Sequence, residues 1–245
     1  MAALACALFA AALAGLSRGF AAFGTAMIYV PIVTLAYDAK TAVVTLFLVD
    51  LAPSIPLVWH AASKCEWTRL SWMALGAAAL SPVGVAVLLV IDQRQAQLVV
   101  GCIVLAATSY MLFGKGIDVD DRPMRSVGAG AVSGFAGGLC GIFGPPAMIY
   151  LLGCNADARS TRANAIVFLT GESLILGATY VCYGMVTLPL LRLSLVLAPT
   201  YAVCLWFGAK QFSHIGEAAY RNMILALLLV TSILTIGRSA LTLLR

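Results

Sequence analysis

The sequence predicts an all-α integral membrane protein made of two inverted repeats, each with about four helical segments and with broken or re-entrant Gly-rich helices. Composition is the first observation: 62% of the 245 residues are hydrophobic and 10% are charged, against about 25% charged residues in an ordinary soluble domain. So few charges cannot cover the surface of a soluble globule of this size. The other two observations are uncharged runs long enough to cross a bilayer and motifs shared by the two halves.

The uncharged runs divide the chain into membrane segments. A helix needs about 20 residues to cross the hydrocarbon core, and the runs 70–91 and 95–114 have this length. The stretches 1–37 and 126–156 are too long for one crossing and are rich in Gly and Pro. We therefore expect each of these two stretches to be a broken helix or a re-entrant hairpin.

Two further segments can be interpreted in more than one way. The stretch 163–209 is too long for one crossing, and we expect it to divide into two helices near Tyr183-Gly184. At the other end of the chain, Ala12-Leu13-Ala14 resembles the cleavage site of a signal peptide, but no basic residue precedes Arg18. A signal peptide begins with a basic region, so we expect the first segment to be retained.

The two halves of the chain resemble each other on either side of a hydrophilic stretch. Four motifs recur in the same order at an offset of 117 to 121 residues, which indicates an internal repeat. We expect a membrane repeat at 1–114, a cytoplasmic linker at 115–127 and a second membrane repeat at 128–245. The paired motifs are Ala26-Met27-Ile28-Tyr29 with Ala147-Met148-Ile149-Tyr150, Phe23-Gly24 with Phe143-Gly144, Asp38-Ala39-Lys40-Thr41 with Asp157-Ala158-Arg159-Ser160, and Leu80-Ser81-Pro82 with Leu197-Ala198-Pro199.

Whether the repeats are parallel or inverted depends on how the first segment of each half is counted. If it crosses once, the basic residues divide six against eight and show no bias. If it enters and returns as a hairpin, nine basic residues share one side against five. Short loops rich in Lys and Arg stay in the cytoplasm, and an odd number of crossings inverts the second repeat, as in many secondary transporters. The nine are Lys64, Arg69, Lys115, Arg122, Arg125, Arg159, Arg162, Lys210 and Arg221.

Several functional classes are disfavoured. The net charge is +5, but the basic residues are scattered and form no stripe of the kind that binds nucleic acid. The seven cysteines show no CxxC spacing and the two histidines are far apart, so we expect no metal site. No nucleotide-binding, GxSxG or HExxH motif occurs. We expect no enzyme and no cofactor; the expected partners are the lipid bilayer, a small anion and protons, with a homodimer left open.

The segments Gly15–Pro31 and Gly134–Tyr150 are the best candidates for a binding site. Dense glycine is expected to unwind a helix, and unwound backbone at membrane depth must be buried in protein or line a cavity. If a short helix restarts at Thr25 and at Pro145, two helix N-termini would form an anion site near the midplane. The alternative is that these glycines only allow close helix packing. The candidate binding residues are Arg18, Gly24, Thr25, Gly141, Gly144, Pro145 and Asn164.

Ionisable residues inside apolar runs are a second set of candidates. Arg18 is expected at the tip of the first hairpin, where it either faces an anion or extends to the membrane interface. Asp50 and Glu172 follow the two hairpins, and a buried carboxyl group can carry a proton during transport. Alternatively, each is a partner for Arg18 or another polar group. Asn164 and Thr170 either line the path or join helices by hydrogen bonds.

The Gly-rich segments also resemble a known family. The run from Gly134 to Pro146, GFAGGLCGIFGPP, the polar loop ending at Glu66-Trp67 and the turn at Gln93-Arg94 are similar to the half-repeat of the sulfite exporter TauE/SafE family of membrane permeases. The resemblance covers nearly the whole chain, although Phe23-Gly24-Thr25-Ala26 replaces a glycine run in the first copy.

The resemblance implies a secondary transporter that exports small sulfur-containing anions, such as sulfite or organosulfonates, across the bacterial inner membrane. Two alternatives remain open at this point: an anion channel-like pore, which broken helices can also build, and a permease for another small inorganic or organic anion.

The charge asymmetry gives a testable topology. We expect the 115–127 linker in the cytoplasm and both termini outside. Cysteines introduced at Asp120 and at Leu244, in a background without the native cysteines, should therefore react with an impermeant thiol reagent from opposite sides. Labelling of both positions from the same side would favour a repeat with four crossings.

Overall fold

The computed structural model describes residues 2–21, 24–113, 122–154 and 158–211, and within these ranges it contains helices and no strand. The helices of the first half are α1 (Ala2–Ala21), α2 (Thr25–Thr34), α3 (Ala39–Ala61), the short 3-10 helix η1 (Ala62–Lys64), α4 (Trp67–Val90) and α5 (Gln93–Phe113). Those of the second half are α6 (Pro123–Cys140), α7 (Gly144–Gly153), α8 (Ala158–Cys182) and α9 (Leu188–Gln211). The all-α prediction is confirmed.

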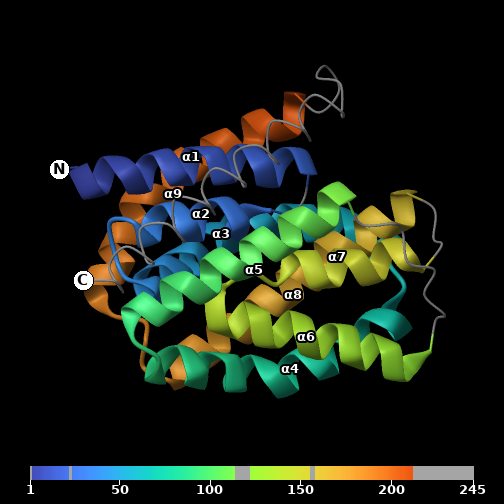
Figure 1. The fold of residues 1–245 in the computed structure, drawn as a ribbon. Coiled ribbons are helices and arrows are strands. Elements are labelled where there is room, and N and C mark those ends of the chain that lie inside the picture. Colours follow the sequence, from blue (N-terminus) through green and yellow to red (C-terminus); the bar gives the residue numbers. More distant parts are fainter. Residues whose placement is uncertain (1, 22–23, 114–121, 155–157, 212–245) are drawn as a thin grey trace.

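The helices form three layers in Figure 1. Helices α1 and α9 pack along each other on one side, α4 and α6 pack along each other on the opposite side, and the remaining helices lie between the two pairs. The first helix of each half thus packs against a late helix of the other half. In Figure 1, α1 runs from the N-terminal end at the left, whereas α6 begins at the right. The inverted orientation of two repeats in the bilayer stays a prediction.

Both long Gly-rich stretches are broken, as expected. The first breaks at Gly24, which has a φ of 88° and precedes α2. The second breaks at Gly141, which ends α6 with a φ of 73° and donates its N–H to the Gly137 carbonyl. Glycine adopts this left-handed conformation without the steric penalty that a Cβ brings. The expected division near Tyr183-Gly184 is also found, because α8 ends at Cys182 and Gly184 has a φ of 65°.

The other glycines of the two stretches do not unwind a helix, and that part of the prediction is wrong. Gly15 and Gly19 lie inside α1, and Gly130, Gly134 and Gly138 lie inside α6. These five glycines allow neighbouring backbones to approach closely, which was the alternative interpretation. A Cβ at Gly19 would lie 2.0 Å from the Leu205 carbonyl oxygen of α9, and one at Gly130 would lie 1.9 Å from the Met73 carbonyl oxygen of α4. Glycine density therefore marks packing faces, and positive φ marks the breaks.

Two further details differ from the sequence prediction. The expected linker began at residue 115 and ended at 127, but α6 begins at Pro123, so the end of that stretch is helical. Proline is suited to the first turn of a helix because it lacks the N–H that would be unpaired there. The part of the expected linker from 115 to 121 lies outside the described residues. The two helices of each hairpin also differ in length: α1 has 20 residues and α2 has 10, and α6 has 18 and α7 has 10.

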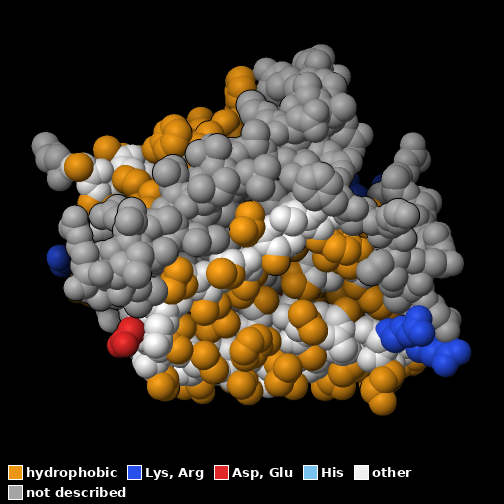
Figure 2. Space-filling model, viewed as in Figure 1, with side chains coloured by type: hydrophobic (Ala, Val, Ile, Leu, Met, Phe, Trp, Pro, Cys, Tyr) orange, Lys and Arg blue, Asp and Glu red, His pale blue; other side chains and the backbone are white. Residues whose placement is uncertain are grey.

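The surface of the molecule fits a bilayer. Five of the described helices, α1, α3, α4, α8 and α9, contain apolar stretches long enough to cross a membrane. Figure 2 shows a broad apolar face over α4 and α6, with the charged side chains near the left and right ends, where the helices end. Large apolar side chains are exposed, including Trp59 with 84% of its surface accessible. Lipid is the solvent that such a face requires.

Close packing of α4 on α6 makes a prediction about two glycines of one helix. Gly130→Ala places a methyl group against the Met73 backbone, whereas Gly128 has open space around its Cβ position. We expect Gly130→Ala to destabilise the protein by about 1–3 kcal/mol or more and Gly128→Ala to leave it unchanged or slightly stabilised through helix propensity. Thermal unfolding in detergent measures both. Equal melting temperatures for the two variants would contradict the tight α4–α6 contact.

Candidate functional site

A small cavity lies where the two helix breaks meet. Its walls come from the α1–α2 break, the α6–α7 break, α3 and α8. The space open to the centre of a water-sized sphere is about 40 Å³, and one water needs roughly 10–15 Å³ by this measure. The cavity therefore has room for a small polyatomic ion or a few waters. The lining residues from the two breaks are Arg18, Gly24, Thr25, Ala26, Gly141, Ile142, Phe143, Gly144 and Pro145.

The first break contributes a helix N-terminus to the cavity. Gly24 is the N-cap of α2 and makes no side-chain cap, so the first N–H groups of α2 are not satisfied by a capping side chain. Thr25 and Ala26 follow directly and line the cavity. Unpaired N–H groups and the helix dipole both favour an anion at such a position.

The second break contributes fewer donors than the sequence analysis assumed. Helix α7 begins at Gly144, and the next two residues, Pro145 and Pro146, have no N–H. The dipole of α7 still places partial positive charge at the cavity. The Gly141 N–H is donated to the Gly137 carbonyl, so backbone donors on this side of the cavity must come from Ile142, Phe143 and Gly144. The two prolines add no donor to the anion site expected at this helix N-terminus.

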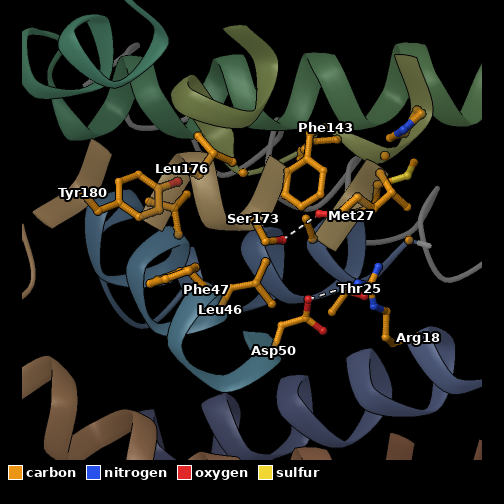
Figure 3. A pocket seen from close by; sticks show the side chains of 18 residues that line it. Arg18, Thr25, Met27, Leu46, Phe47, Asp50, Phe143, Ser173, Leu176 and Tyr180 are labelled. Atoms are coloured by element: carbon orange, nitrogen blue, oxygen red, sulfur yellow. Dashed lines mark hydrogen bonds and ion pairs between the residues drawn. The ribbon is translucent and has the colours of Figure 1, made fainter. Parts of the chain in front are cut away.

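Arg18 and Asp50 face each other at one end of the cavity (Figure 3). Arg18 lies in the last turn of α1, and its Nη2 is 3.4 Å from Asp50 Oδ2 and 3.3 Å from Ser54 Oγ. The Tyr201 hydroxyl of α9 donates to Asp50 Oδ1. Both charged residues are 6% exposed. Arg18 is thus directed into the protein and does not extend to the interface, and Asp50 is its partner, as one of the alternatives held.

The other end of the cavity is aromatic and apolar. Phe47, Leu176 and Tyr180 lie there in Figure 3, away from Arg18. The rings of Phe47 and Tyr180 meet edge to face, with centroids 6.1 Å apart. The Phe47 ring covers Gly177 of α8, where a Cβ would lie 2.0 Å from it. The cavity therefore has one charged end and one end that contacts only apolar atoms and the Tyr180 ring.

Asn164 is not among the residues that line the cavity, and its part in substrate binding stays a prediction. Its Oδ1 accepts a hydrogen bond from the Glu66 backbone N–H at 2.7 Å, and its Nδ2 donates to Glu66 Oε1 at 3.4 Å. Glu66 is the N-cap of α4 and also accepts from Arg69 Nη1 at 3.0 Å. Asn164 lies near the start of α8, and it joins the two halves at the end of the bundle. This is the helix-joining role that was the alternative.

The two carboxyl candidates occupy different places. Asp50 lines the cavity, whereas Glu172 lies behind its wall and is 1% exposed. Glu172 Oε2 is 2.7 Å from Ser133 Oγ of α6. Asp50 and Glu172 follow the broken segments of their respective halves, but their environments in the folded protein differ. Thr170, the other polar residue of this helix considered from the sequence, is buried and does not line the cavity.

Several residues of the site were not predicted from the sequence. Ser54, Ser173 and Tyr201 are the polar ones, and each lies within an apolar run that gives no local signal. The repeat offers a partial signal, because Ser54 and Ser173 are 119 residues apart, inside the offset of the repeated motifs. Tyr201 has no such signal. It lies 151 residues from its partner Asp50, which is outside the offset of the repeated motifs.

Apolar helices of membrane length, with two broken segments that meet at a cavity with a charged end, define a multi-pass helical membrane protein of the transporter class. The family model of the sulfite exporter TauE/SafE matches residues 7–235. The chain therefore belongs to the TauE/SafE sulfite exporter family. No curated protein and no solved structure matches the chain.

The Arg18–Asp50 pair makes a prediction about stability. Removing one member leaves a buried charge without its partner, which costs about 3–5 kcal/mol. Arg18→Gln and Asp50→Asn should each destabilise the protein, and the double variant should be more stable than the sum of the two losses predicts. Thermal unfolding of the purified variants measures the coupling. Simple additivity would mean that the two groups do not interact in the folded protein.

Proposed function

We propose that the protein is a secondary transporter that exports small sulfur-containing anions, sulfite or organosulfonates, across the bacterial inner membrane. Membership of the TauE/SafE family supports the transport class. The observation that carries the proposal is the cavity itself: two broken segments and the Arg18 side chain meet around a space of about 40 Å³. The chain has no nucleotide-binding motif, so an ion gradient or the membrane potential is the proposed energy source.

The cavity suits a small anion for three reasons. Its size fits a small polyatomic ion. The N-termini of α2 and α7 supply partial positive charge at the cavity. Arg18 supplies forked N–H donors, which match the geometry of oxyanions such as sulfite and sulfonate. For an organosulfonate, the carbon-bearing end would lie toward Phe47 and Tyr180.

Asp50 competes with the anion for Arg18. It is 3.4 Å from Arg18 and lines the same cavity, so a bound anion and the Asp50 carboxylate both draw on one guanidinium group. A bound anion and the Asp50 carboxylate carry like charges and repel each other. Anion binding therefore weakens the Arg18–Asp50 contact, and this contact joins α1 to α3. In this proposal, exchange of partners at Arg18 changes how the first hairpin packs on the rest of the protein.

Counterflow in proteoliposomes tests the function. Vesicles loaded with unlabelled sulfite should accumulate labelled sulfite from outside, with a rate that saturates. A panel with sulfate, thiosulfate and a sulfonate as competitors identifies the preferred anion. Ohmic currents without saturation would instead indicate a channel-like pore, and competition by another anion alone would indicate a permease of different specificity.

The two charged residues provide a matched pair of variants for the same assay. Arg18→Gln should weaken sulfite binding, because a hydrogen bond to a charged group contributes about 1.5–3 kcal/mol, roughly ten- to a hundredfold in affinity. Asp50→Asn should strengthen binding, because it removes the competing carboxylate. Calorimetry on monodisperse protein measures both affinities. Changes of the same sign in the two variants would contradict competition at Arg18.

A further inference from the structure

Glu172 is an acid group enclosed behind the wall of the cavity. It is 1% exposed, and in the part of the chain that the structure describes its recorded hydrogen-bond partner is Ser133, while its Oε1 has none. Gly137 makes space for it: a Cβ at Gly137 would lie 3.1 Å from Glu172 Oε1 and 3.1 Å from Phe143 Cβ. Glu172 therefore lies close to Phe143, which lines the cavity.

Ser133 connects Glu172 to that wall. Its Oγ is 2.7 Å from Glu172 Oε2 and 2.7 Å from the backbone carbonyl oxygen of Phe143. A serine hydroxyl has one hydrogen, and a carbonyl oxygen can only accept. The two short contacts need two hydrogens. If Ser133 donates to Phe143, the hydrogen of the other contact must be a proton on Glu172.

The two protonation states of Glu172 differ in how well the buried groups are satisfied. When Glu172 is a neutral acid with its proton on Oε2, it donates to Ser133, Ser133 donates to Phe143, and Oε1 is an unpaired neutral acceptor. When Glu172 is ionised, it is a buried charge with a single donor, and Ser133 can no longer donate to the Phe143 carbonyl. A buried charge without adequate partners costs far more than an unpaired carbonyl.

Among the residues that the structure describes, none of the groups packed around Glu172 supplies a counter-charge. Tyr180 of α8 interacts electrostatically with Glu172 and with Cys140 of α6, and both side chains lack positive charge in any protonation state. Asp50 of α3 is paired with Arg18. On α4, Arg69 is paired with Glu66 at the start of the helix, next to Asn164, which is about two helical turns from Glu172 along α8.

We propose that Glu172 is the proton-carrying group of the transporter: it is a neutral acid in this conformation, donates its hydrogen to Ser133, and is linked through the Ser133 hydroxyl to the Phe143 carbonyl in the wall of the anion cavity. The inference rests on the proposed function and deepens it, because it assigns the coupled proton to Glu172 rather than to Asp50. Asp50 serves instead as the ionised partner of Arg18.

The link explains how proton and anion are coupled. When Glu172 releases its proton, the Ser133 hydroxyl turns from the Phe143 carbonyl to the carboxylate, so the α6–α7 break loses one hydrogen bond. The O–H bond of the Glu172 acid is the covalent bond that breaks in this step, and its proton passes to a water molecule. An anion in the cavity repels a negative Glu172, so anion occupancy favours the neutral acid. By linkage, the neutral acid favours anion occupancy to the same extent.

Infrared spectroscopy tests the protonation state without transport. Wild-type protein in nanodiscs at neutral pH should show a protonated-carboxyl C=O stretching band that Glu172→Gln removes. Asp92→Asn, which removes an exposed carboxyl from the α4–α5 turn, should leave that band in place. Ser133→Ala should shift the band to higher frequency, because the acid loses its acceptor. A wild-type spectrum without the band, or a band that persists in Glu172→Gln, overturns the proposal.

Proteoliposomes then test the coupling with sulfite as the probe. Glu172→Gln mimics the neutral acid, so it should retain sulfite exchange while accumulation driven by a pH gradient falls to the level seen without a gradient. Accumulation that still follows the gradient would assign the proton to another group. Absence of any sulfite flux in the wild type, with the infrared band present, would contradict the proposed substrate but not the protonation of Glu172.

Discussion

Two helix breaks inside the protein are the constraint on which the rest of the structure depends. A backbone that leaves the helical conformation at membrane depth exposes N–H and C=O groups that lipid cannot satisfy. Gly24 precedes α2 and Gly141 ends α6, both in the left-handed conformation, and residues of both breaks line a cavity together with α3 and α8. The breaks also shape the candidate site, because the backbone at the breaks and the restarting helices bring polar groups to one end of this cavity.

The enclosure is built by two close helix pairs. Helix α1 packs on α9 and α6 packs on α4, with glycines at the crossing points. Each pair joins one half of the chain to the other, so both halves contribute to the bundle around the breaks. Small residues permit this approach because lipid gives no hydrophobic driving force for helix association, and van der Waals contact must supply it.

The buried acidic residues divide into two electrostatic roles. Asp50 forms an ion pair with Arg18 and accepts from Tyr201, so its negative charge has partners. Glu172 has Ser133 as its one recorded partner within the described residues, and a neutral acid satisfies the local hydrogen bonds best. In the proposed cycle, an anion competes with Asp50 for Arg18, and binding of the anion is coupled to the proton on Glu172. Both residues lie in helices that follow a broken segment. Their different roles therefore come from the side chains that surround them and not from their positions in the chain.

The sequence by itself determined the membrane class, the family resemblance, the positions of both breaks and the part of the cavity lining that the breaks contribute. These follow from composition, from the lengths of apolar runs and from a repeated motif, which are local properties of the chain. Arg18, Gly24, Thr25, Gly141, Gly144 and Pro145 were predicted in this way and are brought together by the fold.

Only the tertiary structure decided which glycines break a helix and which pack, because the two uses have the same local composition and differ only in φ and in the neighbouring backbone. It also placed Asn164 at the end of the bundle, paired Arg18 with Asp50 and isolated Glu172 behind the cavity. The partners concerned are 98 residues apart for Asn164 and Glu66, and 39 for Ser133 and Glu172. Contacts between residues so far apart in the chain exist only once the helices have packed, so periodicity and composition could not reveal them.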